Sequence, residues 1–287
     1  MLLPIAAVLA GFLVLIFSAD RFVVGASALA RNLGVSPLVV GLVIVGFGTS
    51  APEMLVSGLA AWQGNTGLSV GNAVGSNITN IGLILGVAAL VRPLDVHSSI
   101  LRRELPLLLA AILVALVLLL DGVLGRWDGL LLLTGFVLVI YATVALAFSQ
   151  RETRGDALAD EFSAEMPPAM SNARALALLA AGLVLLLASS RMLVWGAVEL
   201  AMAFGVSDLV IGLTIVAIGT SLPELAATVA AALKDEHDIA IGNVVGSNTF
   251  NTLAVLGLPG VIAPGGFVPE LLQRDFPLMI GLTLALF

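Results

Sequence analysis

Two glutamates lie inside strongly hydrophobic stretches of this chain, and each ends a copy of the same short motif. The copies, 171 positions apart, are Gly48-Thr49-Ser50-Ala51-Pro52-Glu53 and Gly219-Thr220-Ser221-Leu222-Pro223-Glu224. An acid in apolar surroundings is costly unless something compensates its charge. A cation held between the two carboxylates would supply that compensation.

A second pair of motifs repeats at the same offset and adds hydroxyl and amide groups. The copies are Gly71-Asn72-Ala73-Val74-Gly75-Ser76-Asn77-Ile78-Thr79-Asn80 and Gly242-Asn243-Val244-Val245-Gly246-Ser247-Asn248-Thr249-Phe250-Asn251. In each copy the serine and the last asparagine are one helical turn apart and share a helix face. Hard cations prefer such oxygen ligands, and two carboxylates match the charge of one Ca²⁺. The same shell could hold Na⁺, and competition for the carboxylates would then couple the two ions.

Proline interrupts the helix beside each glutamate. Pro52 has no N–H and displaces the carbonyl group of Gly48, so we expect the helix to unwind there. Carbonyl groups freed at membrane depth must be buried or face a wet cavity, where a cation is a natural partner. Thr49 and Glu53 are one turn apart and can line the same pocket. The second motif repeats this arrangement.

Simpler roles are open for some of these groups. Gly71/Gly75 and Gly82/Gly86 form small-xxx-small patterns that helix packing alone could explain. A threonine or serine in a membrane helix can bond to its own backbone. A single buried glutamate could be a protonated structural group. Two at equivalent positions, each in a proline-broken helix, favour a ligand role.

The composition is that of a polytopic helical membrane protein, with 60% hydrophobic residues, 11% charged residues and a mean hydropathy of +1.13. The chain has no cysteines, which excludes disulfides and thiolate metal sites. His97 and His237 lie outside the apolar spans, so we expect no histidine-based metal site. The net charge of −7 argues against nucleic-acid binding. The apolar N-terminus lacks a basic region and is interpreted as the first span rather than a signal peptide.

Nine apolar segments are predicted to be spans: 3–31, 37–62, 68–91, 100–120, 128–149, 174–203, 208–233, 239–262 and 271–287. The halves align without a gap from Ser18/Ser189 to Pro106/Pro277, so spans one to four correspond to spans six to nine. A five-span unit is odd, so the second copy must enter the membrane from the opposite side. The predicted fold is an all-α polytopic membrane protein, an inverted repeat with copies at 1–149 and 174–287 joined by a linker at 150–173. The counterpart of the fifth span would fall near 299–320, beyond Phe287.

The basic residues predict that the N-terminus is outside. Two of them, Arg126 and Arg274, would face outward, and eight would face the cytoplasm: Arg31, Arg92, Arg102, Arg103, Arg151, Arg154, Arg174 and Lys234. The linker is then cytoplasmic, and its acids could bind calcium in a regulatory way or simply be solvated. The run Asp235-Glu236-His237-Asp238 is likewise interpreted as a solvated segment. We expect a monomeric protein of the inner (plasma) membrane.

The paired motifs resemble the α-repeats of the cation/calcium exchanger superfamily, and the short linker resembles that of its prokaryotic sodium/calcium exchangers. The resemblance implies ten spans, with spans two, three, seven and eight forming a core of broken helices. It implies a transporter rather than an enzyme, which exchanges Ca²⁺ for Na⁺ by alternating access as spans one and six slide past the core.

Carried over by position, the resemblance also implies a set of metal-binding residues and no cofactor. Ca²⁺ would be coordinated by Glu53, Glu224, Thr49 and Thr220. An inner Na⁺ site would use Thr49, Ser76 and the Gly46 carbonyl group, and an outer one Thr220, Ser247 and the Ala217 carbonyl group. Asn80 and Asn251 would complete the middle, and Ser50 and Ser221 belong to the same set. Members similar to this chain carry Asp where Asn251 stands, which leaves the number of coupled ions open. Some relatives use H⁺ or K⁺.

Spans one and six offer one more pair of charges. Asp20 and Arg191 occupy equivalent repeat positions and are predicted to approach each other, because a charge in an apolar run should be paired. Arg21 is an equally available partner, and either side chain could instead snorkel to the surface.

Two other functions deserve comparison. A cation channel could use the same acids as a selectivity ring, but an inverted repeat with broken helices favours a carrier. An intramembrane protease needs paired aspartates, or serine with histidine, in its spans. Here the doubled acids are glutamates and no histidine lies in a span.

Overall fold

The computed structural model describes residues 2–95, 100–153, 170–205 and 217–286, and most of them are helical. A long helix, α1 (Leu2–Leu33), comes first. The rest of the first half consists of α2 (Pro37–Val40), η1 (Gly41–Val45), α3 (Gly46–Thr49), α4 (Ala51–Trp62), α5 (Thr66–Thr79), η2 (Asn80–Leu85), α6 (Gly86–Val91), η3 (Ile100–Glu104), α7 (Leu105–Leu118), β1 (Val123–Leu124) and α8 (Arg126–Thr153), where η marks a π-helical segment.

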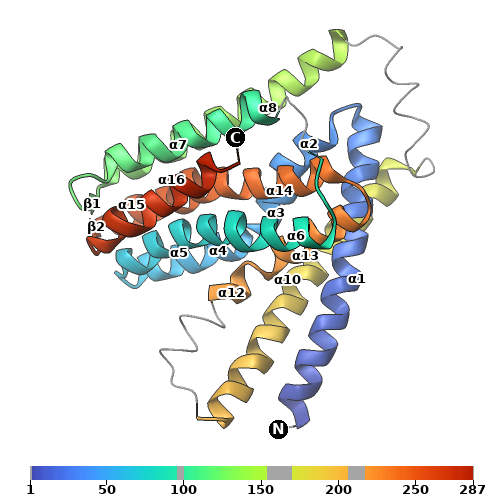
Figure 1. Ribbon diagram of the computed structural model, residues 1–287, viewed down its shortest axis with the longest axis horizontal. Helices are drawn as coiled ribbons and strands as arrows, with labels where there is room; N and C mark the ends of the chain where they lie inside the picture. Colours follow the sequence, from blue (N-terminus) through green and yellow to red (C-terminus); the bar gives the residue numbers. More distant parts are fainter. Residues whose placement is uncertain (1, 96–99, 154–169, 206–216, 287) are drawn as a thin grey trace.

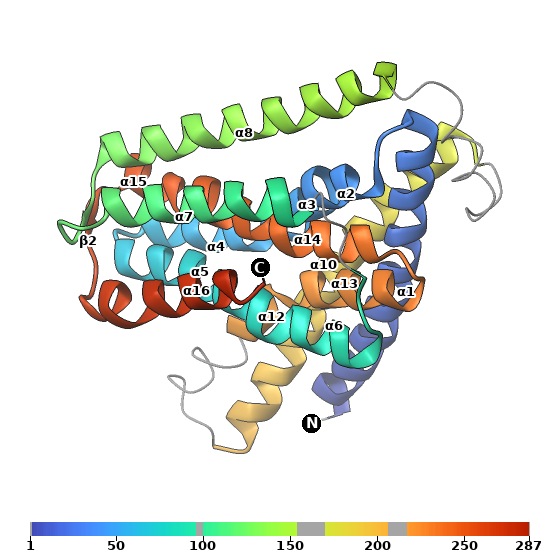
Figure 2. The same ribbon diagram turned by 45° about the horizontal axis from the view of Figure 1, so that its top comes forward.

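The second half follows the same order. It consists of α10 (Asn172–Ala203), α12 (Ala217–Thr220), α13 (Leu222–Leu233), α14 (His237–Phe250), η5 (Asn251–Val255), α15 (Gly257–Ile262), β2 (Gly265–Gly266), η6 (Leu271–Asp275) and α16 (Phe276–Leu284). Figures 1 and 2 show α1 and α10 side by side, crossing the end of a body built from the other helices. The short strands β1 and β2 pair antiparallel at the other end of that body.

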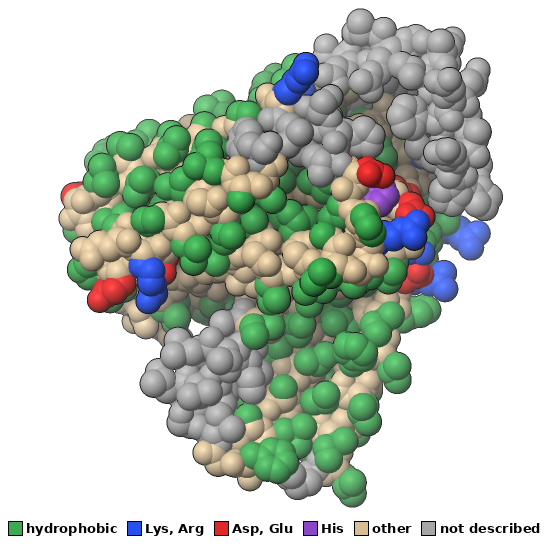
Figure 3. Space-filling model, in the orientation of Figure 1, with side chains coloured by type: hydrophobic (Ala, Val, Ile, Leu, Met, Phe, Trp, Pro, Cys, Tyr) green, Lys and Arg blue, Asp and Glu red, His purple; other side chains and the backbone are tan. Residues whose placement is uncertain are grey.

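The described part of the chain has five helices that are long and apolar enough to cross a membrane. The segment from Pro37 to Trp62 is a sixth candidate if its two parts, bent by 43°, count as one span. Figure 3 shows charged side chains gathered at the ends of the visible face, with hydrophobic and uncharged groups between them. Many large hydrophobic side chains are exposed, including those of Leu13, Val137 and Val184. The chain is therefore a multi-pass helical membrane protein.

The two halves repeat in structure as well as in sequence. The bounds of α3–α4, α5 and α6 recur 171 positions later in α12–α13, α14 and α15. Gly34 and Gly205 both have a positive φ, and so do Gly64 and its counterpart Asp235. The counterparts α1 and α10 run antiparallel, since Gly11 packs on Leu193 and Gly25 on Leu179. The same backbone path is thus traced twice in opposite directions.

Helix α14 lies at the centre, and the residues from Ile239 to Phe250 are all buried. It lies directly against α2 and η1: a Cβ on Gly246 would come within 2.3 Å of the Leu42 carbonyl oxygen, and one on Gly242 within 2.8 Å of the Leu38 carbonyl oxygen. Close approach of the helices therefore depends on glycine. Helix packing, one explanation of the glycine pattern, thus applies to the second copy. For Gly71 and Gly75 in the first copy the explanation stays a prediction, because 208–216, the repeat counterpart of α2 and η1, lies outside the described residues.

The predicted approach of Asp20 to Arg191 is wrong. The Asp20 carboxylate lies 2.6 Å from Lys234 Nζ and 3.7 Å from Arg21 Nε. Phe22 packs beside Gly182, and Gly11 packs beside Leu193. In this register Asp20 and Arg191 are roughly seven residues apart along the antiparallel axes, which is about 10 Å.

The segment Asp235-Glu236-His237-Asp238 was predicted to be solvated, but two of its acids contact other helices. Asp235 pairs with Arg92 at 2.7 Å, and Glu236 accepts a hydrogen bond from the Ser27 hydroxyl group. These contacts and the Lys234–Asp20 pair tie α1 and α6 to the α13–α14 turn. We call Asp20, Ser27, Lys234 and Glu236 the α1 latch.

Candidate functional site

Both motif helices break directly before their prolines. The breaks fall at Ser50, with φ −78° and ψ 4°, and at Ser221, with φ −88° and ψ 5°. Pro52 and Pro223 then lie in the first turn of α4 and α13. The structure confirms the interruption expected from the prolines, because proline fits the start of a helix but not its interior.

The breaks place Glu53 and Glu224 in the first turns of the new helices, where an acid interacts favourably with the backbone N–H groups. Each side chain is only 1% exposed. Each glutamate also faces the opposite repeat: Ser221 Oγ donates to Glu53 Oε1 at 3.5 Å, and Ser50 Oγ donates to Glu224 Oε1 at 3.4 Å. The two acids are therefore joined through the hydroxyl groups of the other copy.

Neither glutamate has a salt bridge in the part of the chain that the structure describes. The second oxygen of each, Oε2, is buried without a hydrogen-bond partner among the described residues. Buried charge without a counter-charge is expensive. These oxygens are consequently available to an ion that the protein does not itself supply.

The first motif also brings neutral oxygens to the same place. Thr49 Oγ1 lies 3.1 Å from Asn243 Oδ1 and 3.4 Å from Ser247 Oγ. The Gly46 carbonyl oxygen lies 3.5 Å from Ser247 Oγ. Thr49, Ser247 and Gly46 therefore meet at the contact between the repeats, beside the glutamates. The predicted grouping of Ser247 with Thr220 is wrong, because the Ser247 hydroxyl group lies on the Thr49 side. Thr220 lies next to Glu53, as Thr49 lies next to Glu224.

The amides of the second motifs lie between the repeats. Asn80 Nδ2 donates to Asn248 Oδ1 at 2.9 Å, while Asn80 Oδ1 is buried with no partner in the part of the chain that is described. Both polar atoms of the fully buried Asn251 lack partners among the described residues. Of the seven buried unpartnered side-chain atoms found there, all but His237 Nδ1 belong to the repeated motifs. The unsatisfied polar atoms therefore concentrate at the predicted site.

Fewer contacts locate the remaining predicted ligands, Ser76 and Ala217. Ser76 is buried on the same helix turn as Asn80. Ala217 begins α12 directly after 206–216, which lie outside the described residues. A carbonyl group freed by proline has a protein partner in one repeat: Gly219 O accepts from Ser190 Oγ at 3.0 Å.

A pair of asparagines at the site was not among the predicted ligands. Asn72 Nδ2 donates to the Glu53 carbonyl oxygen at 3.2 Å, and Asn243 Nδ2 donates to the Glu224 carbonyl oxygen at 3.3 Å. Their repetition within the second motifs, at the 171-residue offset, was the available signal. Their contacts with the glutamate backbones could not be deduced from the sequence, because they join different helices.

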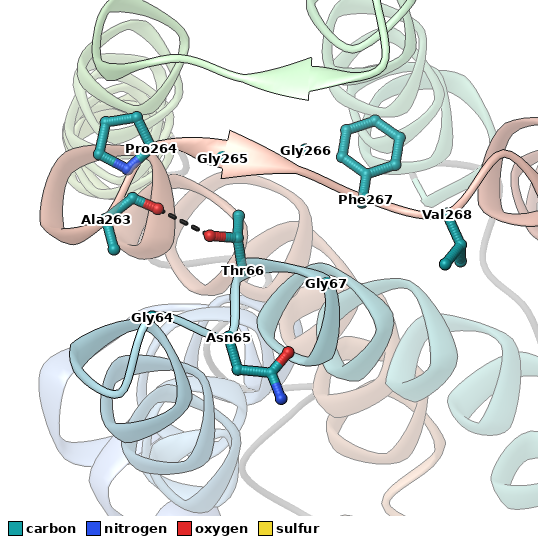
Figure 4. A pocket seen from close by; sticks show the side chains of 10 residues that line it. All are labelled: Gly64, Asn65, Thr66, Gly67, Ala263, Pro264, Gly265, Gly266, Phe267 and Val268. Carbon is teal, nitrogen blue, oxygen red and sulfur yellow. Dashed lines mark hydrogen bonds between the residues drawn. The ribbon is translucent and has the colours of Figure 1, made fainter.

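A surface pocket of about 540 Å³ lies elsewhere, between the α4–α5 turn and the segment after α15. Figure 4 shows its lining from Gly64 to Gly67 and from Ala263 to Val268, with Thr66 Oγ1 donating to the Ala263 carbonyl oxygen at 2.8 Å. The lining contains no charged side chain and neither glutamate, so the pocket is separate from the predicted cation site.

Comparison with known families agrees with this arrangement. The model of the family described as "Sodium/calcium exchanger protein" matches residues 3–145 and 174–287. The chain belongs to this family. Sodium/calcium exchanger family proteins are membrane ion transporters, not enzymes, so this chain is a cation exchanger of that family.

Several relatives are similar to this chain over nearly its whole length. The putative antiporter CaxA of Alkalimonas amylolytica is 51% identical over 286 residues, covering 100% of this chain and 89% of the relative. The inner membrane protein YrbG of Escherichia coli K12 is 46% identical, covering 98% and 86%. The sodium/calcium exchanger MaX1 of Methanosarcina acetivorans is 35% identical, covering 97% and 88%.

Among solved structures of exchangers, one of the sodium–calcium exchanger NCX_Mj soaked with Na⁺ and Ca²⁺ is similar over the whole chain. The TM-score is 0.86 at 32% identity, covering 100% of this chain and 90% of that one.

Proposed function

We propose that this exchanger is a secondary antiporter that moves Ca²⁺ against Na⁺ across a membrane by alternating access. The observation that carries the proposal is the pair of buried carboxylates, Glu53 and Glu224, one from each repeat and each with an oxygen lacking a described partner. Two such charges call for compensation by cations. The surrounding hydroxyl, amide and carbonyl oxygens suit Na⁺ and Ca²⁺. Relatives named as sodium/calcium exchangers support this choice of ions.

In the proposed cycle, the two inverted repeats at 1–149 and 174–287 form one carrier, and the linker at 150–173 and the N-terminus lie on opposite sides of the membrane. The pair formed by α1 and α10 slides past the core as a unit. Close packing within the pair supports this role, because a Cβ on Gly25 would come within 2.5 Å of the Leu179 backbone nitrogen. Such packing leaves little room for movement between the two helices.

The proposed division of roles follows the oxygen types. Glu53 and Glu224 hold Ca²⁺ with Thr49 and Thr220, and Ser50 and Ser221 orient the acids. One Na⁺ ion uses Thr49, Ser247 and the Gly46 carbonyl group, which lie together. By the repeat, the other uses Thr220, Ser76 and the Ala217 carbonyl group. Asn80 and Asn251 lie between them. Because Ca²⁺ and Na⁺ use the same threonines and balance the charge of the same carboxylates, occupancy by one excludes the other.

The test is uptake of radiolabelled Ca²⁺ by proteoliposomes that contain the purified protein. We expect uptake only when Na⁺ is loaded inside and diluted outside. Parallel experiments impose H⁺ or K⁺ gradients instead. Uptake driven by H⁺ alone would replace the proposal with Ca²⁺/H⁺ exchange, and a requirement for K⁺ together with Na⁺ would add a third ion. Rapid Ca²⁺ equilibration without any opposing gradient would identify a channel.

A further inference from the structure

Asn243 connects the two repeats next to the carboxylates. It is fully buried in α14. Its amide nitrogen donates to the Glu224 carbonyl oxygen at 3.3 Å and to Thr228 Oγ1 at 2.9 Å. Its amide oxygen accepts from Thr49 Oγ1 at 3.1 Å. One side chain therefore binds the backbone of one glutamate and a hydroxyl group of the opposite motif.

The backbone of Glu224 fixes which way this amide points. A carbonyl oxygen can only accept, so the NH₂ group of Asn243 must face Glu224. The amide oxygen is then directed at Thr49. Burial of the whole group makes the reverse orientation costly, because it would set two oxygens against each other away from water.

The direction of the Thr49 proton decides what this hydroxyl group can bind. A hydroxyl group has one proton and two lone pairs. The other acceptors within reach are the carbonyl oxygens of Val45, at 3.1 Å, and Gly46, at 3.4 Å, and Ser247 Oγ, at 3.4 Å. If the proton goes to Asn243, both Thr49 lone pairs are open to a cation. The Gly46 carbonyl oxygen accepts from the Ser50 N–H group at 3.0 Å and then has a second lone pair that Thr49 does not use.

We propose that Asn243 is a positioning residue for cation exchange, which holds the Thr49 hydroxyl group with its lone pairs toward the ion. The inference rests on the proposed function and assigns Asn243 no direct contact with the ion. It predicts a loss of ion affinity that depends on Thr49.

The repeat supplies a matched control in Asn72. This residue makes the same pair of donations, to the Glu53 carbonyl oxygen at 3.2 Å and to Ser57 Oγ at 3.0 Å. Its described contacts do not include Thr49. Asn72→Leu therefore removes an equivalent support of a glutamate and leaves the Thr49 hydroxyl group untouched.

The experiment is a double-mutant cycle on Ca²⁺ uptake driven by a Na⁺ gradient. Asn243→Leu should raise the Ca²⁺ concentration for half-maximal uptake about tenfold, the size expected for a lost buried hydrogen bond, with a smaller change in the maximal rate. Combined with Thr49→Ala, the loss should be clearly smaller than the product of the single losses. In the double variant Asn72→Leu, Thr49→Ala, the loss of apparent Ca²⁺ affinity should equal the product of the two single losses.

If the single losses multiply in the Asn243/Thr49 double variant as they do in the Asn72/Thr49 one, the role of Asn243 is overturned. The proposed exchange function would not be affected by that result. If Asn243→Leu does not yield folded protein, Thr228→Val replaces it, with Ser57→Ala as its counterpart. Thr228→Val removes only an acceptor of the Asn243 amide, so a non-multiplicative effect with Thr49→Ala supports the proposal and a multiplicative one overturns it. A wild-type protein that shows no exchange would instead overturn the proposed function, and this inference with it.

Discussion

Glu53 and Glu224 each keep one carboxylate oxygen without a described protein partner. Glu53→Gln or Glu224→Gln preserves shape but removes a charge that the proposed Ca²⁺ ion needs. We expect each change to reduce Na⁺-driven Ca²⁺ uptake by roughly a hundredfold or more, since losing one side of a buried charge interaction costs several kcal/mol. Thr49→Ala and Thr220→Ala should cost only about tenfold, because each removes a neutral ligand.

Initial uptake rates in proteoliposomes measure these effects, and melting temperatures in detergent show that the variants are folded. Substantial exchange by the double variant Glu53→Gln, Glu224→Gln would show that the two acids do not hold the transported ion.

Asn251 is fully buried between the repeats with neither side-chain polar atom bonded to a described residue. Asn251→Asp adds a third acid to the proposed cation site. The added charge should favour another bound cation, so we expect the Na⁺ dependence of Ca²⁺ uptake to become steeper or to shift in midpoint. Asn248→Asp is the control, because Asn248 Oδ1 already accepts from Asn80. An unchanged Na⁺ curve for Asn251→Asp would place this residue outside the ion pathway.

Among the described helices, α14 depends on glycine for close backbone contact. A methyl group on Gly246 would meet the Leu42 backbone at 2.3 Å, whereas one on the exposed Gly281 of α16 would meet no described atom within 4 Å. We expect Gly246→Ala to lower the melting temperature in detergent and to abolish most transport, because helix backbones cannot yield at such distances. Gly281→Ala should change neither measurement. Equal melting temperatures for the two variants would contradict this account of the packing.

The α1 latch involves the first helix and the turn after α13. Its ion pair, Asp20 with Lys234 at 2.6 Å, has no symmetric partner, because the repeat counterparts are Arg191 and Gln63. Asp20→Lys should reduce transport by placing two positive charges together, and the exchanged pair Asp20→Lys, Lys234→Asp should recover part of it. Ca²⁺ uptake measures the recovery. Arg191→Asp added to Asp20→Lys is the control and should give no recovery.

At the scale of the whole molecule, the proposed sliding of α1 and α10 can be tested with cross-links. The chain has no cysteines, so introduced pairs react without background. A disulfide between Ser27→Cys and Glu236→Cys would join α1 to the core across the latch. We expect oxidation to stop Ca²⁺ uptake and reduction to restore it. Unimpaired uptake by the fully cross-linked protein would rule out movement of α1 past this turn.

The matched control joins the two helices that should move together. A Cβ on Gly11 would lie 3.1 Å from the Leu193 Cβ, so the helices need to part by only about 0.5 Å to reach the roughly 3.5–4.5 Å found in disulfides. The pair Gly11→Cys, Leu193→Cys should cross-link and still transport, because α1 and α10 keep their mutual position in the proposed cycle.

The repeat and the helix breaks could be read from the sequence because they depend on local chemistry. Proline removes a backbone donor wherever it stands, so Pro52 and Pro223 located the breaks to within two residues. A gapless offset of 171 implied two copies of one path, and the helix bounds of the structure recur at that offset. Clustering of the two acids with the hydroxyl and amide groups followed from the same repetition. The assignment of particular ligands to particular ions stays a prediction.

Which residues contact one another across different helices was decided only by the tertiary structure. Sequence symmetry favoured Asp20 with Arg191, but the packing of Gly11 on Leu193 and of Phe22 on Gly182 sets a register that separates them. The spacing of the glycines in the second motif did not reveal that Gly242 and Gly246 lie in direct backbone contact with α2 and η1. Likewise, Asn243 gained its role from contacts with Glu224 and Thr49 on other helices. Local propensity determines where helices begin and break, whereas side-chain volumes across a helix pair determine register and therefore which groups meet.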